Sequence, residues 1–125
     1  MSNSYRDLDV WNLGVELVTQ IYRLTDDFPQ NERYGLVSQL RRAAVSVPSN
    51  ITEGQGRLTG GEFRHCLSIA RGSLMEIETQ LLISVNLGFV QRSKIEEFLD
   101  HCDRIRRMLY PLVLSISDGP IPGNS

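Results

Sequence analysis

Ten consecutive residues without a charge, residues 43–52 (AAVSVPSNIT), lie inside a long helical pattern and have Pro48 near their centre. A helix on the outside of a soluble monomer carries a charged face opposite its apolar stripe. This segment lacks such a face, so we expect it to be covered on more than one side, first by its own chain and then by another copy. Because proline has no backbone N–H, Pro48 leaves the carbonyl of Ala44 without its helical partner, which predicts a kinked second helix.

Four segments carry the apolar periodicity of helices, with steps that alternate between three and four residues, as in a left-handed bundle. They cover about residues 9–28, 32–56, 59–88 and 93–117. Short connections between long helices make neighbouring helices antiparallel. The sequence therefore predicts an all-α, antiparallel, up-down-up-down four-helix bundle over residues 9–117, with an N-terminal arm at residues 1–8 and a disordered C-terminal tail at residues 118–125.

Local signals indicate where these helices begin and end. The residues that carry them are Asp9, Thr59 with Glu62, Gly88, and Ser93 with Glu96. The aspartate is the expected N-cap of the first helix. The two pairs are capping boxes that should open the third and fourth helices, and the glycine is the expected C-cap of the third.

Composition and charge narrow the class of protein. The 125 residues are 41% hydrophobic and 22% charged, which describes one ordinary globular domain. A net charge of -2 disfavours a general polyanion binder. Residues 33–71 nevertheless hold six arginines against two glutamates, a local net charge of +4. Lys94 is the single lysine, and arginine suits fixed hydrogen bonds at interfaces.

The first residues contain no apolar run of signal-peptide length, and the chain has no stretch of about 18 uncharged apolar residues that would cross a membrane. The sequence thus predicts a cytoplasmic protein without a membrane partner. Cys66 and Cys102 lie far apart without a CxxC motif. In the cytoplasm such cysteines are expected to be buried thiols, not a disulfide.

Candidate metal ligands do not come together in the predicted bundle. His65–Cys66 and His101–Cys102 are separated along the bundle by roughly 20 Å at 1.5 Å per residue, too far for a shared zinc ion within one chain. Glu62-x-x-His65 matches half of the di-iron pattern, and the second half is missing. No Ser, His and acid grouping indicates a nucleophile. We therefore expect no catalytic residues, no metal, no cofactor and no small-molecule substrate.

The second helix has a polar sector about 100° wide beside its apolar stripe. Its members are Gln39, Arg42, Ser46, Ser49, Asn50, Glu53 and Arg57. One interpretation is a core helix with a solvated polar edge. The interpretation we favour is a polar network at a subunit interface on the second and third helices, with Arg42 and Arg71 paired to Glu53, Glu76 or Glu78.

Two long runs carry a resemblance to a known family: LVSQLRRAAVSVPSNITEGQGR at residues 36–57 and FRHCLSIARGSLMEIETQLLISVNLG at residues 63–88. With the N-terminal YRDLDVWNLGVELVTQIY, they resemble the four-helix-bundle proteins encoded by intervening sequences of 23S ribosomal RNA genes. The resemblance covers about residues 5–114. It implies a small bacterial protein that assembles into a ring of five bundles.

A related branch of that family, the accessory subunit of diversity-generating retroelements, is similar in fold and binds nucleic acid together with a reverse transcriptase. That branch is basic, whereas this chain is mildly acidic. We expect a non-enzymatic homo-oligomer, a pentamer, that acts as a scaffold or accessory protein. The alternative is an RNA- or DNA-binding protein that uses Arg41, Arg57, Arg64 and Arg71 around the loop between the second and third helices.

Overall fold

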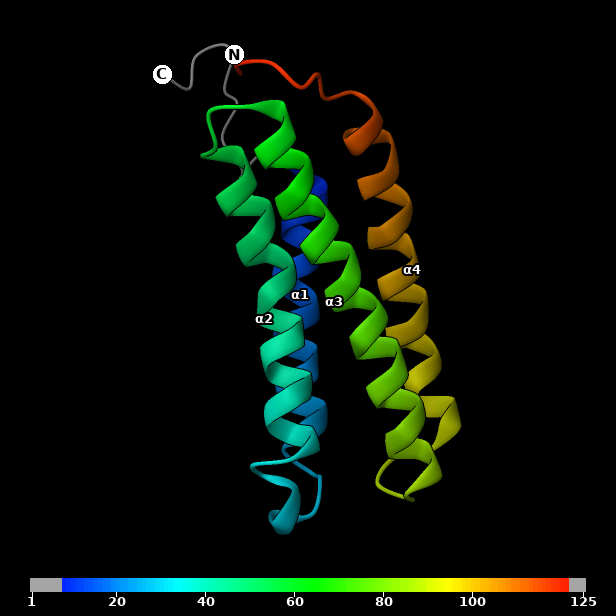
Figure 1. The fold of residues 1–125 in the computed structure, drawn as a ribbon. Helices are drawn as coiled ribbons and strands as arrows, with labels where there is room; N and C mark the ends of the chain where they lie inside the picture. The colour runs from blue at the N-terminus through cyan, green and yellow to red at the C-terminus, as the bar shows by residue number, and fades with distance from the viewer. Residues whose placement is uncertain (1–7, 122–125) are drawn as a thin grey trace.

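A computed structural model describes residues 8–121, which form four α-helices and no β-strand. The helices are α1 (Asp9–Thr25), α2 (Leu36–Gln55), α3 (Gly60–Asn86) and α4 (Arg92–Leu114), with a short 3-10 helix, η2 (Gln30–Glu32), between the first two. The α1–α2 and α3–α4 connections lie at one end of the molecule and the α2–α3 connection at the other (Figure 1). The all-α, four-helix prediction is confirmed.

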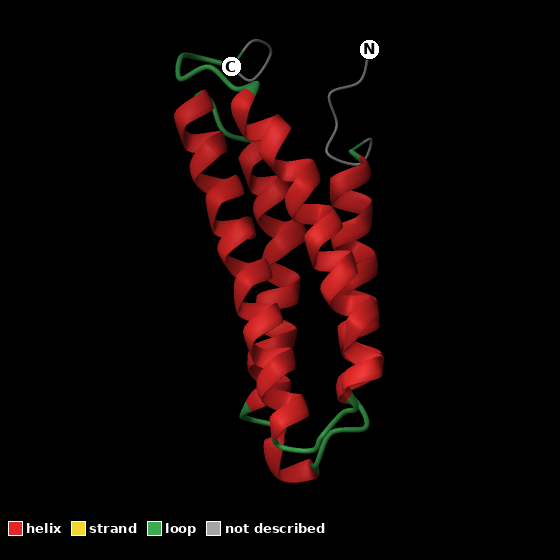
Figure 2. Ribbon diagram, turned by 90° about the vertical axis from the view of Figure 1, so that its right-hand side faces the viewer, coloured by secondary structure: helices red, strands yellow, loops and turns green. Residues whose placement is uncertain are grey.

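Each helix packs closely against two neighbours, in the order α1, α2, α3, α4 and back to α1, and the backbones of diagonally opposite helices do not approach each other. The four long axes run side by side over most of their length (Figure 2). The core between them contains the predicted apolar stripes, and its largest fully buried side chains include Leu17, Leu40, Leu74 and Ile105. Among the described helices, none is long and apolar enough to cross a lipid bilayer.

The predicted N-cap of α3 is confirmed, whereas the C-cap is Leu87 and the predicted Gly88 follows it by one position. The Thr59 side chain accepts the backbone N–H of Glu62 at 3.2 Å, which is the N-cap half of a capping box. At the other end Gly88 has a φ of 79°, and the Phe89 N–H reaches the Ser84 carbonyl at 2.9 Å. A glycine suits this left-handed position because it has no Cβ to clash there.

The predicted N-caps of α1 and α4 were wrong, although α1 begins at Asp9 as predicted. The N-cap of α1 is Leu8, and Asp9 is the first helical residue. Its negative charge interacts favourably there with the positive end of the helix dipole. The N-cap of α4 is Gln91, which places Ser93 inside the first turn. A serine inside the helix cannot take the extended backbone of an N-cap.

The second helix begins later than predicted, at Leu36, because the preceding residues form η2. The Glu32 carboxylate accepts the Leu36 N–H at 3.1 Å. From there α2 continues through Pro48, and the kink stays a prediction. The ring of Pro48 lies against Gly14 of α1, where an added Cβ would lie 3.4 Å from the Pro48 Cβ. The absence of a side chain at Gly14 thus lets α1 and α2 approach closely at the proline.

Residues 118–121 lie against the α2–α3 loop, whereas the sequence predicted a disordered tail at residues 118–125. The Gly60 N–H donates to the Gly119 carbonyl at 2.9 Å, and the Ile121 N–H donates to the Leu58 carbonyl at 2.8 Å. The chain can pass here because Gly60 has no side chain. A Cβ at this position would overlap the Ser117 backbone. Residues 122–125, and the predicted N-terminal arm apart from Leu8, lie outside the described residues.

Candidate functional site

The polar sector of α2 forms hydrogen bonds to α3 within one chain. The Ser73 hydroxyl donates to the Ser46 hydroxyl at 2.8 Å, and the Asn50 amide donates to the same hydroxyl at 3.0 Å. The side-chain N–H of Asn50 also donates to the Ser46 backbone carbonyl at 2.8 Å. Three predicted network residues therefore have hydrogen-bond partners within the chain: Gln39, Ser46 and Asn50.

Sequence reasoning missed the α3 side of this network, which consists of Ser73 and Gln80. Both side chains are buried, and the Gln80 amide donates to Gln39 Oε1 at 3.3 Å. The two residues are seven positions apart, so a polar heptad repeat beside the α3 apolar stripe was the available signal. Within the described residues, the buried Oε1 of Gln80 has no hydrogen-bond donor.

The predicted charge pairs do not form within one chain. Glu53 pairs with Arg57 one turn later, and Glu78 pairs with Arg106 of α4. Arg42 and Arg71 are exposed and make no ion pair with any residue in 8–121. Glu76 and Ser49 are exposed as well.

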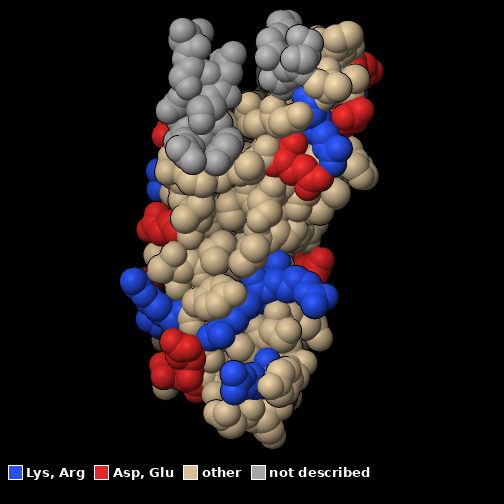
Figure 3. All heavy atoms as spheres, turned by 90° about the vertical axis from the view of Figure 1, so that its left-hand side faces the viewer, with Lys and Arg blue, Asp and Glu red and all other residues tan. Residues whose placement is uncertain are grey.

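The uncharged stretch of α2 is only partly covered by its own chain. Ala43, Ala44 and Val47 are buried, but Val45 is 40% exposed. Figure 3 views this side of the molecule and shows a broad area without charged side chains above a band of basic residues. The single chain therefore leaves part of the stretch open.

Neighbouring residues of α1 extend this uncharged surface. The contact of Arg41 with the Tyr22 carbonyl and that of Pro48 with Gly14 fix how α1 and α2 lie beside each other. Steps of one helical turn from these two contacts identify the other residues that lie beside each other on the two helices. We define the α1–α2 face as the exposed or half-buried residues that this register brings together: Trp11, Val15 and Val18 of α1 with Val45, Ser49 and Thr52 of α2.

The four arginines predicted to bind nucleic acid do not form one cluster. Arg41 lies near the opposite end of α2 from the α2–α3 loop, about 20 Å away along the helix. There its guanidinium donates to Asp26 at 2.9 Å and to the Thr25 hydroxyl at 2.9 Å, and it stacks 4.4 Å above the Tyr22 ring. Arg41 therefore ties the end of α1 to α2.

Arg57 and Arg64 also have partners within the chain. Hydrogen bonding with the Cys66 thiol, together with the nearby charge of Glu53, raises the pKa of Arg57. Arg64 pairs with Asp118 and donates to the Ile116 carbonyl at 2.9 Å. Arg64 thereby holds the segment after α4 against the start of α3.

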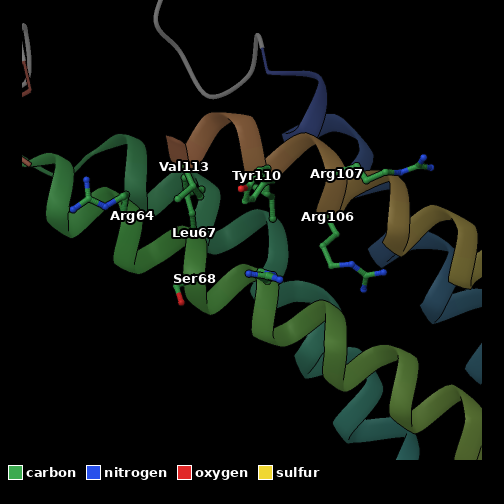
Figure 4. Close-up of a pocket in the computed structure, with 9 residues that line it drawn as sticks. Arg64, Leu67, Ser68, Arg106, Arg107, Tyr110 and Val113 are labelled. Atoms are coloured by element: carbon green, nitrogen blue, oxygen red, sulfur yellow. The ribbon is translucent and has the colours of Figure 1, made fainter. Parts of the chain in front are cut away.

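Arg64 and Arg71 do share one surface, a groove between α3 and α4 with a volume of about 410 Å³. Two further arginines, Arg106 and Arg107, lie beside it, and sequence reasoning did not single them out. Leu67, Tyr110 and Val113 lie between the two helices, with Arg64 toward one end and Arg106 toward the other (Figure 4). We refer to this feature as the α3–α4 groove.

Arg106 is fixed by two carboxylates at the edge of the groove. Its guanidinium lies 2.8 and 2.9 Å from the two Glu78 oxygens and 2.9 Å from Asp103. Hydrogen bonding to Glu78 raises the pKa of Arg106, against a smaller opposing effect of burial. The pair joins the middle of α3 to α4.

The cysteines are buried thiols, as predicted. Burial, with a smaller contribution from the charge of Glu78, raises the pKa of Cys102 to about 12. Among residues 8–121, no three His, Cys, Asp or Glu side chains come together as ligands for a metal ion.

The described helices and surfaces define a small four-helix-bundle protein. The chain belongs to the 23S rRNA-intervening sequence protein family, whose model matches residues 6–111. This finding confirms the resemblance carried by the α2 and α3 sequences.

A solved structure supports the same fold. It is the crystal structure of a protein with unknown function from the S23 ribosomal protein family of Bacteroides thetaiotaomicron VPI-5482. The two chains are 20% identical with a TM-score of 0.74, and the match covers 83% of this chain and 97% of the other. No curated protein matches the sequence.

Proposed function

We propose that this protein is a non-enzymatic, antiparallel up-down-up-down bundle that assembles with copies of itself into a five-membered ring and serves as a scaffold or accessory protein. The observation that supports assembly most strongly is the α1–α2 face. It lacks charge, and it exposes 40% of Val45 and 39% of Val15. An exposed patch of this kind is typical of a protein–protein contact.

A closed ring needs two different complementary surfaces on each copy. The second surface we propose is the outer side of α2 and α3, where Ile69, Glu76 and Ile83 recur at seven-residue intervals beside the buried Gln80. We call it the α2–α3 face. A donor from the next copy would satisfy the unpartnered Oε1 of Gln80.

The placement of these two faces favours a small closed ring. Adjacent sides of a four-helix bundle face directions about 90° apart, and the two contacts of a subunit in a five-fold ring point about 108° apart. Surfaces on opposite sides of the bundle would instead build a filament. The shared helix α2 then carries contacts on both of its outer sides.

A charge placed on the α1–α2 face tests this proposal. We expect Val45→Arg to dissociate the assembly, because a buried unpaired guanidinium is costly. Leu82→Arg is the matched control: Leu82 is 38% exposed, also on a helix, but outside both faces. Light scattering after size exclusion should report monomers for the first variant and the parent mass for the second. Equal masses for all three proteins would refute the proposed contact.

The alternative function, binding of RNA or DNA, has less support, because Arg41, Arg57 and Arg64 pair within the chain. A salt titration tests it, since each neutralised phosphate steepens the dependence of binding on salt. Binding with a steep salt dependence would favour this alternative as a second role, whereas no binding at low salt would remove it.

A further inference from the structure

The α3–α4 groove combines an apolar floor with arginine at its rim. Leu67 and Leu109 are buried at its base, and Tyr110 is 63% exposed along its wall. Figure 4 shows Tyr110 and Val113 of α4 facing Leu67 of α3 across the groove. A volume of about 410 Å³ is within the range of sites that hold small organic ligands.

Three of the four arginines around the groove are already neutralised. Arg106 contacts Glu78 and Asp103, Arg107 lies 3.2 Å from Asp103, and Arg64 pairs with Asp118. The carboxylates of these pairs would repel a chain of phosphates laid along α3 and α4. The groove is therefore poorly matched to a polyanion.

Arg71 differs from its three neighbours. It is exposed, lines the groove, and makes no hydrogen bond or ion pair among residues 8–121. An arginine can hold a carboxylate through two parallel hydrogen bonds. One uncompensated cation above an apolar floor matches a ligand with one negative charge and an apolar body.

We propose that the α3–α4 groove binds a small amphiphilic carboxylate, with its head group on Arg71 and its apolar chain along Leu67, Tyr110 and Val113. This proposal revises the expectation that no small molecule is bound. It does not depend on ring assembly, because none of these residues belongs to the α1–α2 or α2–α3 face.

The full-length protein can be tested with the fluorescent anion 8-anilinonaphthalene-1-sulfonate and with decanoate as competitor. We expect decanoate to displace the probe at least tenfold more effectively than decanol, which has the same chain without the charge. Arg71→Gln should weaken decanoate binding about tenfold. Arg104→Gln is the matched control, since Arg104 is an exposed arginine of α4 that does not line the groove. It should bind as the parent does.

A second variant tests the apolar half of the site. Tyr110→Ser removes an exposed ring and is expected to leave folding intact, which circular dichroism checks, while it weakens both the probe and decanoate. Three results would overturn the proposal: equal binding by Arg71→Gln and Arg104→Gln, equal competition by decanol and decanoate, or displacement of the probe by a single-stranded oligonucleotide at lower concentration than decanoate. The last result would assign the groove to a polyanion.

Discussion

At the scale of single residues, the Glu78–Arg106 pair is the least exposed of the ion pairs of residues 8–121, and we expect it to contribute most to stability. The side chains are 19% and 25% exposed, against 54% and 62% for Glu96 and Arg92. Partial burial weakens solvent screening, so each charge depends more on its partner.

Glu78→Gln should therefore lower the free energy of unfolding by about 1–3 kcal/mol. Glu96→Gln, which breaks an exposed pair on one helix, should change it by less than about 0.5 kcal/mol. Urea denaturation of the two variants measures both values. Similar effects would mean that burial of the first pair has no energetic consequence.

The Cys102 thiol should make stability depend on pH in the alkaline range. Its pKa rises from an ordinary value of 9.0 to about 12 in the folded protein. The unfolded chain thus loses this proton first as pH increases, and the contribution of Cys102 to stability is present below pH 9 and is lost progressively toward pH 12.

We expect the stability difference between the parent and Cys102→Ala to shrink as the pH is raised from about 8 to about 10.5. Urea denaturation at each pH measures the difference, and comparison with the variant cancels the titration of other groups. A difference that stays constant or grows over this range would contradict the buried, protonated thiol.

At the scale of elements, the contact between the α2–α3 loop and residues 118–121 depends on Gly60, and the adjacent Gly61 has different surroundings. A Cβ at Gly60 would overlap the Ser117 backbone, whereas a Cβ at Gly61 would meet nothing within 4 Å. The two positions are adjacent in the first turn of α3, so they form a natural pair for comparison.

Gly60→Ala should displace the segment after α4 and destabilise the protein by about 1–3 kcal/mol. Gly61→Ala should be neutral or stabilise it by up to about 1 kcal/mol, because alanine favours the helix. Thermal unfolding gives the stabilities, and hydrogen exchange of the Ile121 N–H reports on the contact itself. Unchanged protection of this N–H in Gly60→Ala would show that the segment is held elsewhere.

The elements that could be predicted from sequence are those set by local patterns. The apolar stripes indicated four helices, and the ends of α3 followed from Thr59 and Gly88, whose effects need only neighbouring residues. The N-caps of α1 and α4 were misassigned because Leu8 and Gln91 make no side-chain cap hydrogen bond, so no capping residue marks these positions in the sequence.

Contacts between helices were beyond the sequence pattern. The polar sector of α2 was recognised, but its partners Ser73 and Gln80 depend on how α3 is turned and shifted against α2. The pairing of Glu78 with Arg106, 28 positions away, likewise requires the packed bundle. The α3–α4 groove was missed for this reason, since its lining comes from two helices.

At the scale of the whole molecule, the uncharged residues 43–52 remain the feature with the widest consequence. The chain buries the apolar side of this stretch and leaves Val45 and Ser49 exposed. In a monomer, charged side chains on this surface would be exposed to water and would cost little. In a ring, the surface would be buried between copies, where unpaired charges are costly.

The mass of the protein in solution tests this account most directly. One chain has a mass of 14.2 kDa, so a five-membered ring should give about 71 kDa by light scattering at micromolar concentration. A mass near this value that falls to about 14.2 kDa in Val45→Arg is the result we predict. A parent protein that is monomeric at that concentration would contradict the account.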